Sequence, residues 1–341
     1  MFEQLLEKAR SGDPAPELAV RILEESRSPE NALKLFGVAA ELRDEHIGRE
    51  LWWTAAIEGI MPCRLDPPCS YCTYSNHEII NTEFLLKALG TLEKLGFRHL
   101  HLSGGTNPAG YDNEIIAMVK AMRAVSDIDI EVNLGPSITR ETVRELKRLG
   151  VSSITSSLET FNEEVFKAAK PGDSLEKRKE LLEICEAEGM PTRGMMLVGL
   201  GESYEDRIAH LFYLRQFKGL VHVRFSRFSP SPSTAYRDRP RCSPWEIART
   251  VAVARLIMPD VQLGLAAGNT HDDIPLWLLA GGGNQLLGAA AVRRRPPDQP
   301  GVRVTQVAEG VAVVDRTEIP ERYAREMGFT IGKTPPGHAK R

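Results

Sequence analysis

A regular alternation of strand-like and helix-like segments limits the folds that this chain can adopt. Between residues 50 and 290, short apolar segments alternate with longer amphipathic ones. The strand candidates are 55–60, 98–103, 128–134, 153–158, 193–198, 221–226, 261–266 and 283–288. The helix candidates between them include 82–95, 112–125, 139–149, 174–188, 203–217 and 243–258. This order predicts an α/β fold, a (β/α)8 TIM-type barrel, with a doubly wound open sheet as the alternative.

The segments that flank this alternation predict two extensions. Residues 1–50 carry apolar side chains at helical spacing, and Asp13-Pro14 and Ser28-Pro29 supply helix boundaries. We therefore expect an N-terminal helical extension at residues 1–50 and the barrel at 51–292. Residues 293–341 should form a C-terminal extension that packs on the barrel.

Composition excludes several classes of protein. The net charge of −3 gives no reason to expect nucleic-acid binding. No stretch approaches the roughly 18 uninterrupted apolar residues of a membrane helix, and the acidic N-terminus is no secretory signal. Three of the five cysteines fall within ten residues, which indicates metal ligation in a reducing compartment rather than disulfides. We expect a cytoplasmic protein that binds neither nucleic acid nor membrane.

The three clustered cysteines have the spacing Cys63-x5-Cys69-x2-Cys72. Two prolines at 67–68 remove backbone N–H donors, so the segment must form a loop that can turn the three sulfurs to one side. Two interpretations fit this loop. One is a structural zinc site with His77 as the fourth ligand. The other is an iron–sulfur cluster in which one iron lacks a protein ligand and is therefore reactive.

Polar and glycine-rich residues follow several of the predicted strands. The cysteine loop follows the first strand, and Ser-Gly-Gly-Thr-Asn-Pro follows the second at 103–108. Residues 157–160 and 199–203 follow the fourth and fifth strands. Active sites of such barrels lie at the carboxyl ends of the strands. The shared location favours a catalytic cluster over a structural zinc site.

These residues together resemble the radical S-adenosylmethionine (SAM) superfamily, in the branch of biotin synthase, the hydrogenase maturase HydE and methylornithine synthase, PylB. The resemblance covers residues 50–330. Most of that branch has the spacing Cys-x3-Cys-x2-Cys, whereas Cys63-x5-Cys69-x2-Cys72 is similar to the HmdB (HcgA) family. That family is associated with assembly of the iron-guanylylpyridinol cofactor of [Fe]-hydrogenase.

The resemblance implies a specific chemistry. Cys63, Cys69 and Cys72 would bind three irons of a [4Fe–4S] cluster, while SAM chelates the fourth. An external electron donor of the flavodoxin or ferredoxin type would reduce the cluster. SAM would then be cleaved to methionine and a 5′-deoxyadenosyl radical, which abstracts hydrogen from a small-molecule substrate.

The resemblance also implies which residues contact SAM. Glu159 and Arg178 would bind its polar groups, because a guanidinium can donate two parallel hydrogen bonds to a carboxylate. Taken alone, Glu159 could instead be a helix-capping acid, and Arg178 a solvated helix residue. The full set of expected SAM-binding residues is Tyr71, Gly104, Gly105, Thr106, Glu159, Arg178, Gly199 and Gly201.

Candidate substrate contacts come from polar residues of the later strands. These are Glu131, Asn133, Arg224, Arg227, Asn269 and His271. Residues three apart on a regular strand face opposite sides, so only one of the two arginines should point inward. An inward arginine needs a compensating anion, which would be the substrate or an internal carboxylate such as Glu131.

Three hypotheses for the function remain open. The favoured one is an HmdB-like enzyme that abstracts hydrogen from a small cofactor precursor in [Fe]-hydrogenase cofactor biosynthesis. The second is a PylB-like carbon-skeleton mutase or a HydE-like hydrogenase maturase. The third is a zinc-stabilised barrel that binds a ligand without redox chemistry. Biotin synthase itself is disfavoured, because Asn269 stands where biotin synthases have the arginine ligand of a second cluster.

Overall fold

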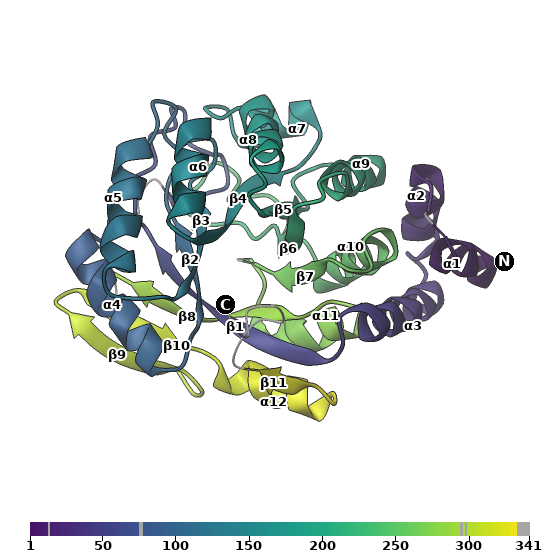
Figure 1. Ribbon diagram of the computed structural model, residues 1–341. Coiled ribbons are helices and arrows are strands. Elements are labelled where there is room, and N and C mark those ends of the chain that lie inside the picture. The colour runs from purple at the N-terminus through teal and green to yellow at the C-terminus, as the bar shows by residue number, and fades with distance from the viewer. Residues whose placement is uncertain (13, 75–77, 267, 294–295, 297–298, 333–341) are drawn as a thin grey trace.

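The computed structural model describes residues 1–12, 14–74, 78–266, 268–293, 296 and 299–332. Eight strands alternate with helices and form the expected barrel, with the helices outside the strands (Figure 1). The strands are β1 Glu50–Glu58, β2 His99–Ser103, β3 Asp129–Asn133, β4 Val151–Glu159, β5 Thr192–Val198, β6 Leu220–Arg227, β7 Gln262–Leu265 and β8 Gln285–Val292. The helices are α4 Thr82–Lys94, α5 Asp112–Arg123, α6 Arg140–Arg148, α7 Glu163–Ala169, α8 Leu175–Ala187, α9 Tyr204–Arg215, α10 Pro244–Ile257 and α11 Ile274–Leu279.

Short polar side chains begin several of these helices. Asn81, Thr139, Asn162, Ser174 and Ser203 each accept a hydrogen bond from a backbone N–H of the first turn. These bonds satisfy donors that have no partner within the helix. The starts of the helices after the strands are therefore encoded locally, which holds the strand-to-helix loops in place.

The barrel has an incomplete seam between its last two strands. All neighbouring pairs from β1 to β7 are parallel, and β8 pairs in parallel with β1. Between β7 and β8 the described residues form only one bridge, in which Leu263 and Gly283 exchange backbone hydrogen bonds of 2.7 and 3.0 Å. The pairing of the first with the eighth strand excludes the open doubly wound sheet.

The apolar core lies between the strands and the surrounding helices, while the barrel interior is largely polar. Outward strand residues such as Leu100, Ile130 and Val223 are fully buried against helices. Arg193 and Glu131 are also buried, but they belong to hydrogen-bonded contacts inside the barrel. A polar interior places charged groups directly beneath the carboxyl ends of the strands.

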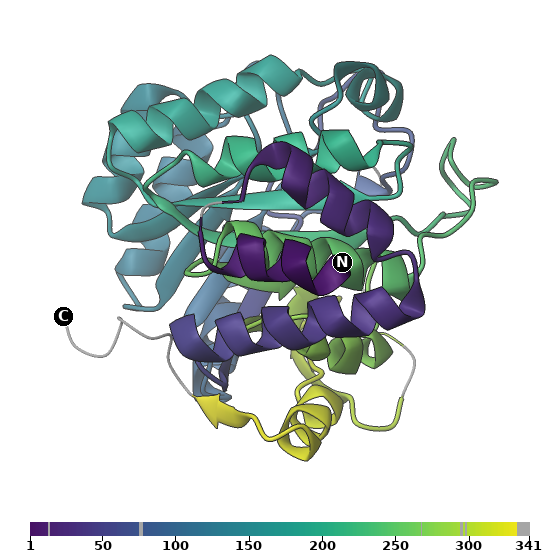
Figure 2. The same cartoon turned by 90° about the vertical axis from the view of Figure 1, so that its right-hand side faces the viewer.

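Three helices precede the barrel: α1 Phe2–Arg10, α2 Pro16–Glu25 and α3 Pro29–His46. They lie together over one side of the barrel (Figure 2). α3 packs against α10 and α11, and α2 packs against α9 and α10. Their apolar faces join the core of that side, so they cover the helices of the second half of the barrel.

The chain after β8 adds strands that the sequence pattern did not predict. β9 Arg303–Ala308 and β10 Val311–Asp315 form an antiparallel hairpin that extends the sheet beyond β8. α12 Glu318–Glu326 follows, and β11 Thr330–Gly332 pairs with the start of β1. This pairing explains why β1 begins at Glu50, five residues before the predicted start. In the part of the chain that the structure describes, no helix is long and apolar enough to cross a membrane.

Candidate active site

A cavity of about 450 Å³ opens at the carboxyl ends of the strands. Its rim is formed by the loop after β1, by residues 103–106 after β2 and by residues 226–229 at the end of β6. Deeper in the barrel its wall includes His101, Thr155 and Gln285, which lie on β2, β4 and β8. The cavity therefore runs from the loops into the barrel interior.

All three clustered cysteines line this cavity. Cys63, Cys69 and Cys72 are partly exposed, and their thiols are free. The start of their loop is fastened to the loop after β2, where the N–H of Gly105 donates to the carbonyl of Met61 at 2.9 Å. A side chain at Gly105 would collide with the backbone of Cys63. Glycine is therefore required at residue 105 for this close approach.

The other side of the cysteine loop rests on the turn between α7 and α8. The N–H and the hydroxyl of Ser70 donate to the carbonyls of Ala169 and Ala168 at 2.8 and 2.9 Å. A Cβ atom on Gly172 would overlap the carbonyl oxygen of Pro67. The loop is thus held between the β2 loop and the α7–α8 turn.

The chemistry of these thiols fits an iron–sulfur cluster. Burial raises the pKa of Cys69 despite the nearby charges of Lys170 and Arg178, and burial raises the pKa of Cys72 to about 11. Metal binding requires thiolates, so loading the site releases protons. Within the described residues, no three Cys, His, Asp or Glu side chains gather as ligands of a single ion. His77, the fourth ligand of the zinc interpretation, lies outside the described residues.

A buried cluster beside the cysteine loop consists of four charged side chains, those of Glu159, Lys170, Asp173 and Arg178. All of them except Asp173 line the cavity. Arg178 and Lys170 both pair with the same carboxylate oxygen of Asp173, at 2.6 and 3.3 Å. The Lys170 ammonium also lies 4.0 Å from Glu159 and 5.8 Å from the ring centre of Tyr71. Burial raises the pKa of Tyr71 well above its usual range, so the phenol is neutral.

The carboxylate of Glu159 has an oxygen available for a ligand. Its Oε2 atom is buried and has no hydrogen-bond partner among the described residues. The backbone of Glu159 has φ +64°, which is a strained conformation for a residue other than glycine. The alternative role as a helix cap is wrong, because the side chain of Asn162 caps α7.

Arg178 is buried rather than solvated, so its alternative interpretation is also wrong. Its guanidinium donates to Asp173 through Nε and Nη2, to the carbonyl of Ser157 and to the hydroxyl of Thr106. These bonds use four of the five N–H groups of an arginine. Arg178 can therefore donate one further hydrogen bond into the cavity, instead of the two that the sequence predicted.

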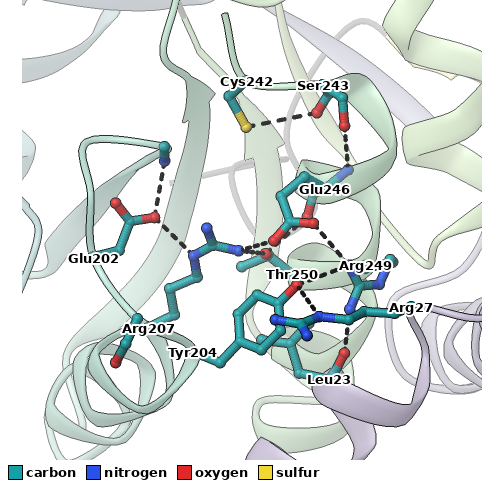
Figure 3. Close-up of polar contacts among 12 residues, drawn as sticks. Leu23, Arg27, Glu202, Tyr204, Arg207, Cys242, Ser243, Glu246, Arg249 and Thr250 are labelled. Carbon is teal, nitrogen blue, oxygen red and sulfur yellow. Dashed lines mark hydrogen bonds and ion pairs between the residues drawn. The ribbon is translucent and has the colours of Figure 1, made fainter. Parts of the chain in front are cut away.

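The carboxylate of Glu202 holds the loop after β5 through hydrogen bonds to its backbone. Gly199 and Gly201 have φ of +99° and +116°, and neither lines the cavity. The side chain of Glu202 accepts hydrogen bonds of 2.8, 2.8 and 3.1 Å from the N–H groups of Gly199, Leu200 and Gly201. Arg207 donates to the same carboxylate at 2.7 Å (Figure 3). The backbone conformation of this loop therefore depends on a buried ion pair.

A chain of buried charges continues from this ion pair to the N-terminal helices (Figure 3). Arg207 also pairs with Glu246 of α10 at 2.5 Å, and Glu246 pairs with Arg249 at 2.7 Å. Arg249 donates to the hydroxyl of Ser26 at 3.1 Å and to the carbonyl of Leu23 at the end of α2. The loop after β5 and helix α2 are thus joined by an unbroken series of contacts.

The floor of the cavity is built around Glu131. Its fully buried carboxylate accepts hydrogen bonds from Arg224 at 2.5 and 2.6 Å, from Thr155 at 2.5 Å and from Nδ1 of His101 at 2.8 Å. Glu131 therefore does not reach the cavity, and the expectation that it contacts substrate is corrected. Asn133, two residues further along β3, does line it.

The other expected substrate contacts are placed differently. Arg224 and Arg227 both line the cavity, whereas regular alternation predicts that only one of them would. Arg227 is the last residue of β6, and its guanidinium pairs with Asp273 at 2.9 Å. The amide of Asn269 donates to the carbonyls of Phe225 and Ala266. Neither Asn269 nor His271 is part of the cavity wall.

Three functional candidates were missed by the sequence reasoning. Lys170 and Asp173 lie in the Lys-Pro-Gly-Asp turn between α7 and α8, which carries no periodic signal. His101 stands two residues before Ser103, so strand alternation alone places it on the same face as a residue of the predicted site.

Comparison with known proteins agrees with this geometry. The family model "Radical SAM superfamily" matches residues 62–214, and "Biotin and Thiamin Synthesis associated domain" matches residues 225–289. The protein MJ0785 of Methanocaldococcus jannaschii is 29% identical over 263 residues, covering 74% of this chain and 69% of that protein. Biotin synthase of Carboxydothermus hydrogenoformans is 25% identical over 271 residues, covering 75% and 82%.

Two solved structures share the fold over nearly the whole chain. Methylornithine synthase (PylB) superposes with a TM-score of 0.77 at 21% identity, covering 96% of this chain and 97% of its own. The FeFe-hydrogenase maturase HydG of Carboxydothermus hydrogenoformans gives a TM-score of 0.81 at 18% identity, covering 100% and 81%.

Enzymes of the matched superfamily use a [4Fe–4S] cluster and SAM and need an external reductant. This similarity favours the iron–sulfur cluster over the zinc-stabilised binding barrel. The two family matches include the cysteine loop, the charged cluster and, on the cavity floor, His101 and Glu131 but not Arg224. Residues 62–214 thus match the radical SAM superfamily model, and this similarity supports an enzyme that cleaves SAM reductively.

Proposed function

We propose that Cys63, Cys69 and Cys72 each bind a different iron of the [4Fe–4S] cluster and leave the fourth iron for SAM. The observation that carries this proposal is that the three thiols line one cavity on a loop fastened from both sides. When bound, the cluster supplies the electron that cleaves the sulfonium C–S bond of SAM. The residues of this chain position the loop and restrict access to it.

The charged cluster is proposed to orient SAM beside the cysteine loop. The unpaired oxygen of Glu159 suits the ammonium of the methionyl group, because a buried carboxylate gains most from a charged donor. The remaining N–H of Arg178 suits the carboxylate of SAM. Tyr71 offers a neutral aromatic face for adenine, and Gly104 and Gly105 line the cavity where the ligand would lie.

Gly199 and Gly201 are proposed to act through the loop conformation rather than by lining the cavity. In this role the Glu202 carboxylate fixes the backbone that meets the adenine end of SAM. Thr106 is proposed to hold the Arg178 guanidinium, since its hydroxyl accepts a hydrogen bond from Nη2 at 3.2 Å.

For the reaction, we infer hydrogen abstraction from a small cofactor precursor, in the biosynthesis of the [Fe]-hydrogenase (iron-guanylylpyridinol) cofactor. The support is the Cys63-x5-Cys69-x2-Cys72 spacing, which is similar to that of the HmdB family. A flavodoxin or ferredoxin would supply the electron. A carbon-skeleton mutase or a hydrogenase maturase would use the same cavity and the same residues around SAM.

Reconstitution without oxygen tests the proposed cluster. Protein loaded with iron and sulfide, then given dithionite and SAM, should release methionine and 5′-deoxyadenosine. Cys69→Ala should abolish this cleavage, whereas Cys242→Ala, outside the cavity wall, should retain it. Full cleavage by Cys69→Ala would disprove the assigned ligands.

Deuterated candidate substrates test the proposed reaction. Transfer of deuterium from a pyridinol precursor into 5′-deoxyadenosine would support cofactor biosynthesis. Transfer from an amino acid instead would favour the mutase.

A further inference from the structure

The hydrogen-bond partner of His101 fixes which ring nitrogen carries hydrogen. Burial disfavours ionisation of Glu131, but the charges of Arg224 and Arg193 and the hydrogen bond from His101 outweigh it and hold the pKa of the carboxyl well below its usual range. An ionised carboxylate can only accept hydrogen bonds. The Nδ1 atom of His101, 2.8 Å from Glu131, must therefore be the donor. In the neutral ring, Nε2 is then an acceptor.

The Nε2 atom of His101 is open to the cavity. His101 is part of the cavity wall, with 14% of its side chain exposed. No described residue makes a hydrogen bond with Nε2, and the atom is not among the buried unsatisfied ones. His99 and His222, which contact Arg193 inside the barrel, are fully enclosed instead. His101 is thus the one ring among these three histidines that can meet a ligand.

Arg224 and Arg193 both pair with Glu131, the latter at 3.5 Å, so two guanidinium groups share one carboxylate. Asp129 acts on Arg193 from the start of β3. Burial and the arginine charges lower the pKa of His99 and His222 well below the usual range, so these rings are neutral.

Arg224 presents donors beside this acceptor. Its Nη1 and Nη2 atoms each donate one hydrogen bond to Glu131, which leaves further N–H groups of the guanidinium for a ligand. Arg224 lines the cavity, and its Nη1 lies 3.4 Å from Nδ1 of His101. The floor therefore offers one acceptor and adjacent donors, with one carboxylate shared by two guanidinium groups.

We propose that the cavity floor binds the polar end of the substrate, with a hydroxyl or N–H group donating to Nε2 of His101. A neighbouring oxygen of the substrate accepts hydrogen bonds from Arg224. This rests on the proposed function, since the substrate must enter the cavity that holds SAM. The matching chemical class is a hydroxy- or amino-carboxylate. A plain carboxylate would leave Nε2 without a partner, which costs affinity.

The hydrogen position can be measured directly in the holoenzyme. In the oxidised, SAM-loaded enzyme, ¹⁵N NMR of the histidine rings should show His101 with hydrogen on Nδ1 and none on Nε2. His101→Gln identifies the signal. SAM occupies the open iron in this state, so small carboxylates cannot bind there instead. Hydrogen on Nε2 in the resting enzyme would overturn the proposal.

Glycolate and acetate are matched probes, because they differ only in the hydroxyl group. Glycolate should shift the Nε2 signal and bind about tenfold more tightly than acetate, the loss expected for one hydrogen bond. His101→Gln places an amide oxygen close to the position of Nε2 and should keep glycolate binding within about threefold. His101→Leu should reduce it to the level of acetate. Equal binding of the two probes, or no response of Nε2 to saturating glycolate, would refute the substrate class.

A separate assay distinguishes this inference from the proposed function. The wild-type enzyme should cleave SAM reductively in the absence of substrate, which tests the proposed function without the contacts of the cavity floor. If the wild-type enzyme cleaves SAM but fails the glycolate test, only the inference about the floor is wrong. If the loaded wild-type enzyme cleaves no SAM, the proposed function fails first.

Discussion

Replacing Arg207 by methionine tests whether the buried charge chain holds the loop after β5. In Arg207→Met, Glu202 keeps its three backbone N–H donors but loses its cation, and Glu246 keeps only Arg249. The side chain of Glu202 is 2% exposed, so little water can replace the guanidinium. Breaking a buried pair costs 3–5 kcal/mol, and the remaining partners place this case near the lower end, at about 3 kcal/mol.

This energy converts into a measurable shift of the melting temperature. At about 2.1 cal/mol/K of unfolding entropy per residue, a chain of 341 residues has about 0.7 kcal/mol/K, so Tm should fall by about 4 °C. Differential scanning calorimetry measures this shift. Arg237→Met is the matched control, because its partner Asp238 is exposed and the pair contributes little.

The double variant Arg207→Met with Glu202→Gln separates the ion pair from the loss of packing. Glu202→Gln removes the buried charge that Arg207→Met leaves without its cation. Glu202→Gln should therefore lower Tm less in the Arg207→Met background than in the wild type. A Tm loss for Arg207→Met no larger than that of the exposed control, or strict additivity in the double variant, would refute the reasoning.

Three further predictions address pH, SAM binding and cluster loading. Burial lowers the pKa of His210 to about 3, whereas an unfolded histidine takes up a proton near pH 6.5, so stability should fall as pH drops below 6.5. Urea unfolding at pH 7 and pH 5 should show a loss about 2 kcal/mol smaller for His210→Phe than for the wild type; an equal loss would contradict this. Arg178→Ala should weaken SAM binding about tenfold or more with unchanged iron content, and equal affinity by equilibrium dialysis would rule out the proposed contact. Gly105→Ala should lower the iron content after reconstitution, because the new Cβ collides with the backbone of Cys63. Gly90→Ala, which meets no atom within 4 Å, serves as its control, and matching iron contents would disprove the steric argument.

The barrel could be predicted because the alternation of strands and helices is visible in short segments of the sequence. Each of the eight predicted strands overlaps an observed one, and helix caps such as Ser203 mark the boundaries in the sequence. The hairpin of β9 and β10 was missed because β9 lies at the sheet edge and none of its residues is buried, so it lacks an apolar stripe. β11 has only three residues and is defined by its partner, β1, which lies far away in the sequence.

The candidate site was predictable where a short motif carries it. The spacing of the cysteines and the glycines after β2 led to residues that share one cavity. The sequence did not predict which inward-facing side chains reach the cavity. Alternation predicts the face of a strand on which a side chain lies, but not whether another side chain covers it. Glu131 therefore seemed available to substrate, although His101 and Arg224 enclose it. Lys170 was missed because its partners, Glu159 at the end of β4 and Asp173 in the turn, come together only in the folded chain.

The absence of a side chain at Gly172 has a consequence for the exchange of segments between related enzymes. The stretch between Cys63 and Cys69 fits over this glycine, with the carbonyl of Pro67 where a methyl group would otherwise stand. In a chimera with three residues instead of five between the first two cysteines, the shorter loop would leave Gly172 exposed to solvent. One that received only a bulkier residue at 172 would push the loop outward. The two segments therefore form a single transplantable unit, and neither can be swapped without the other.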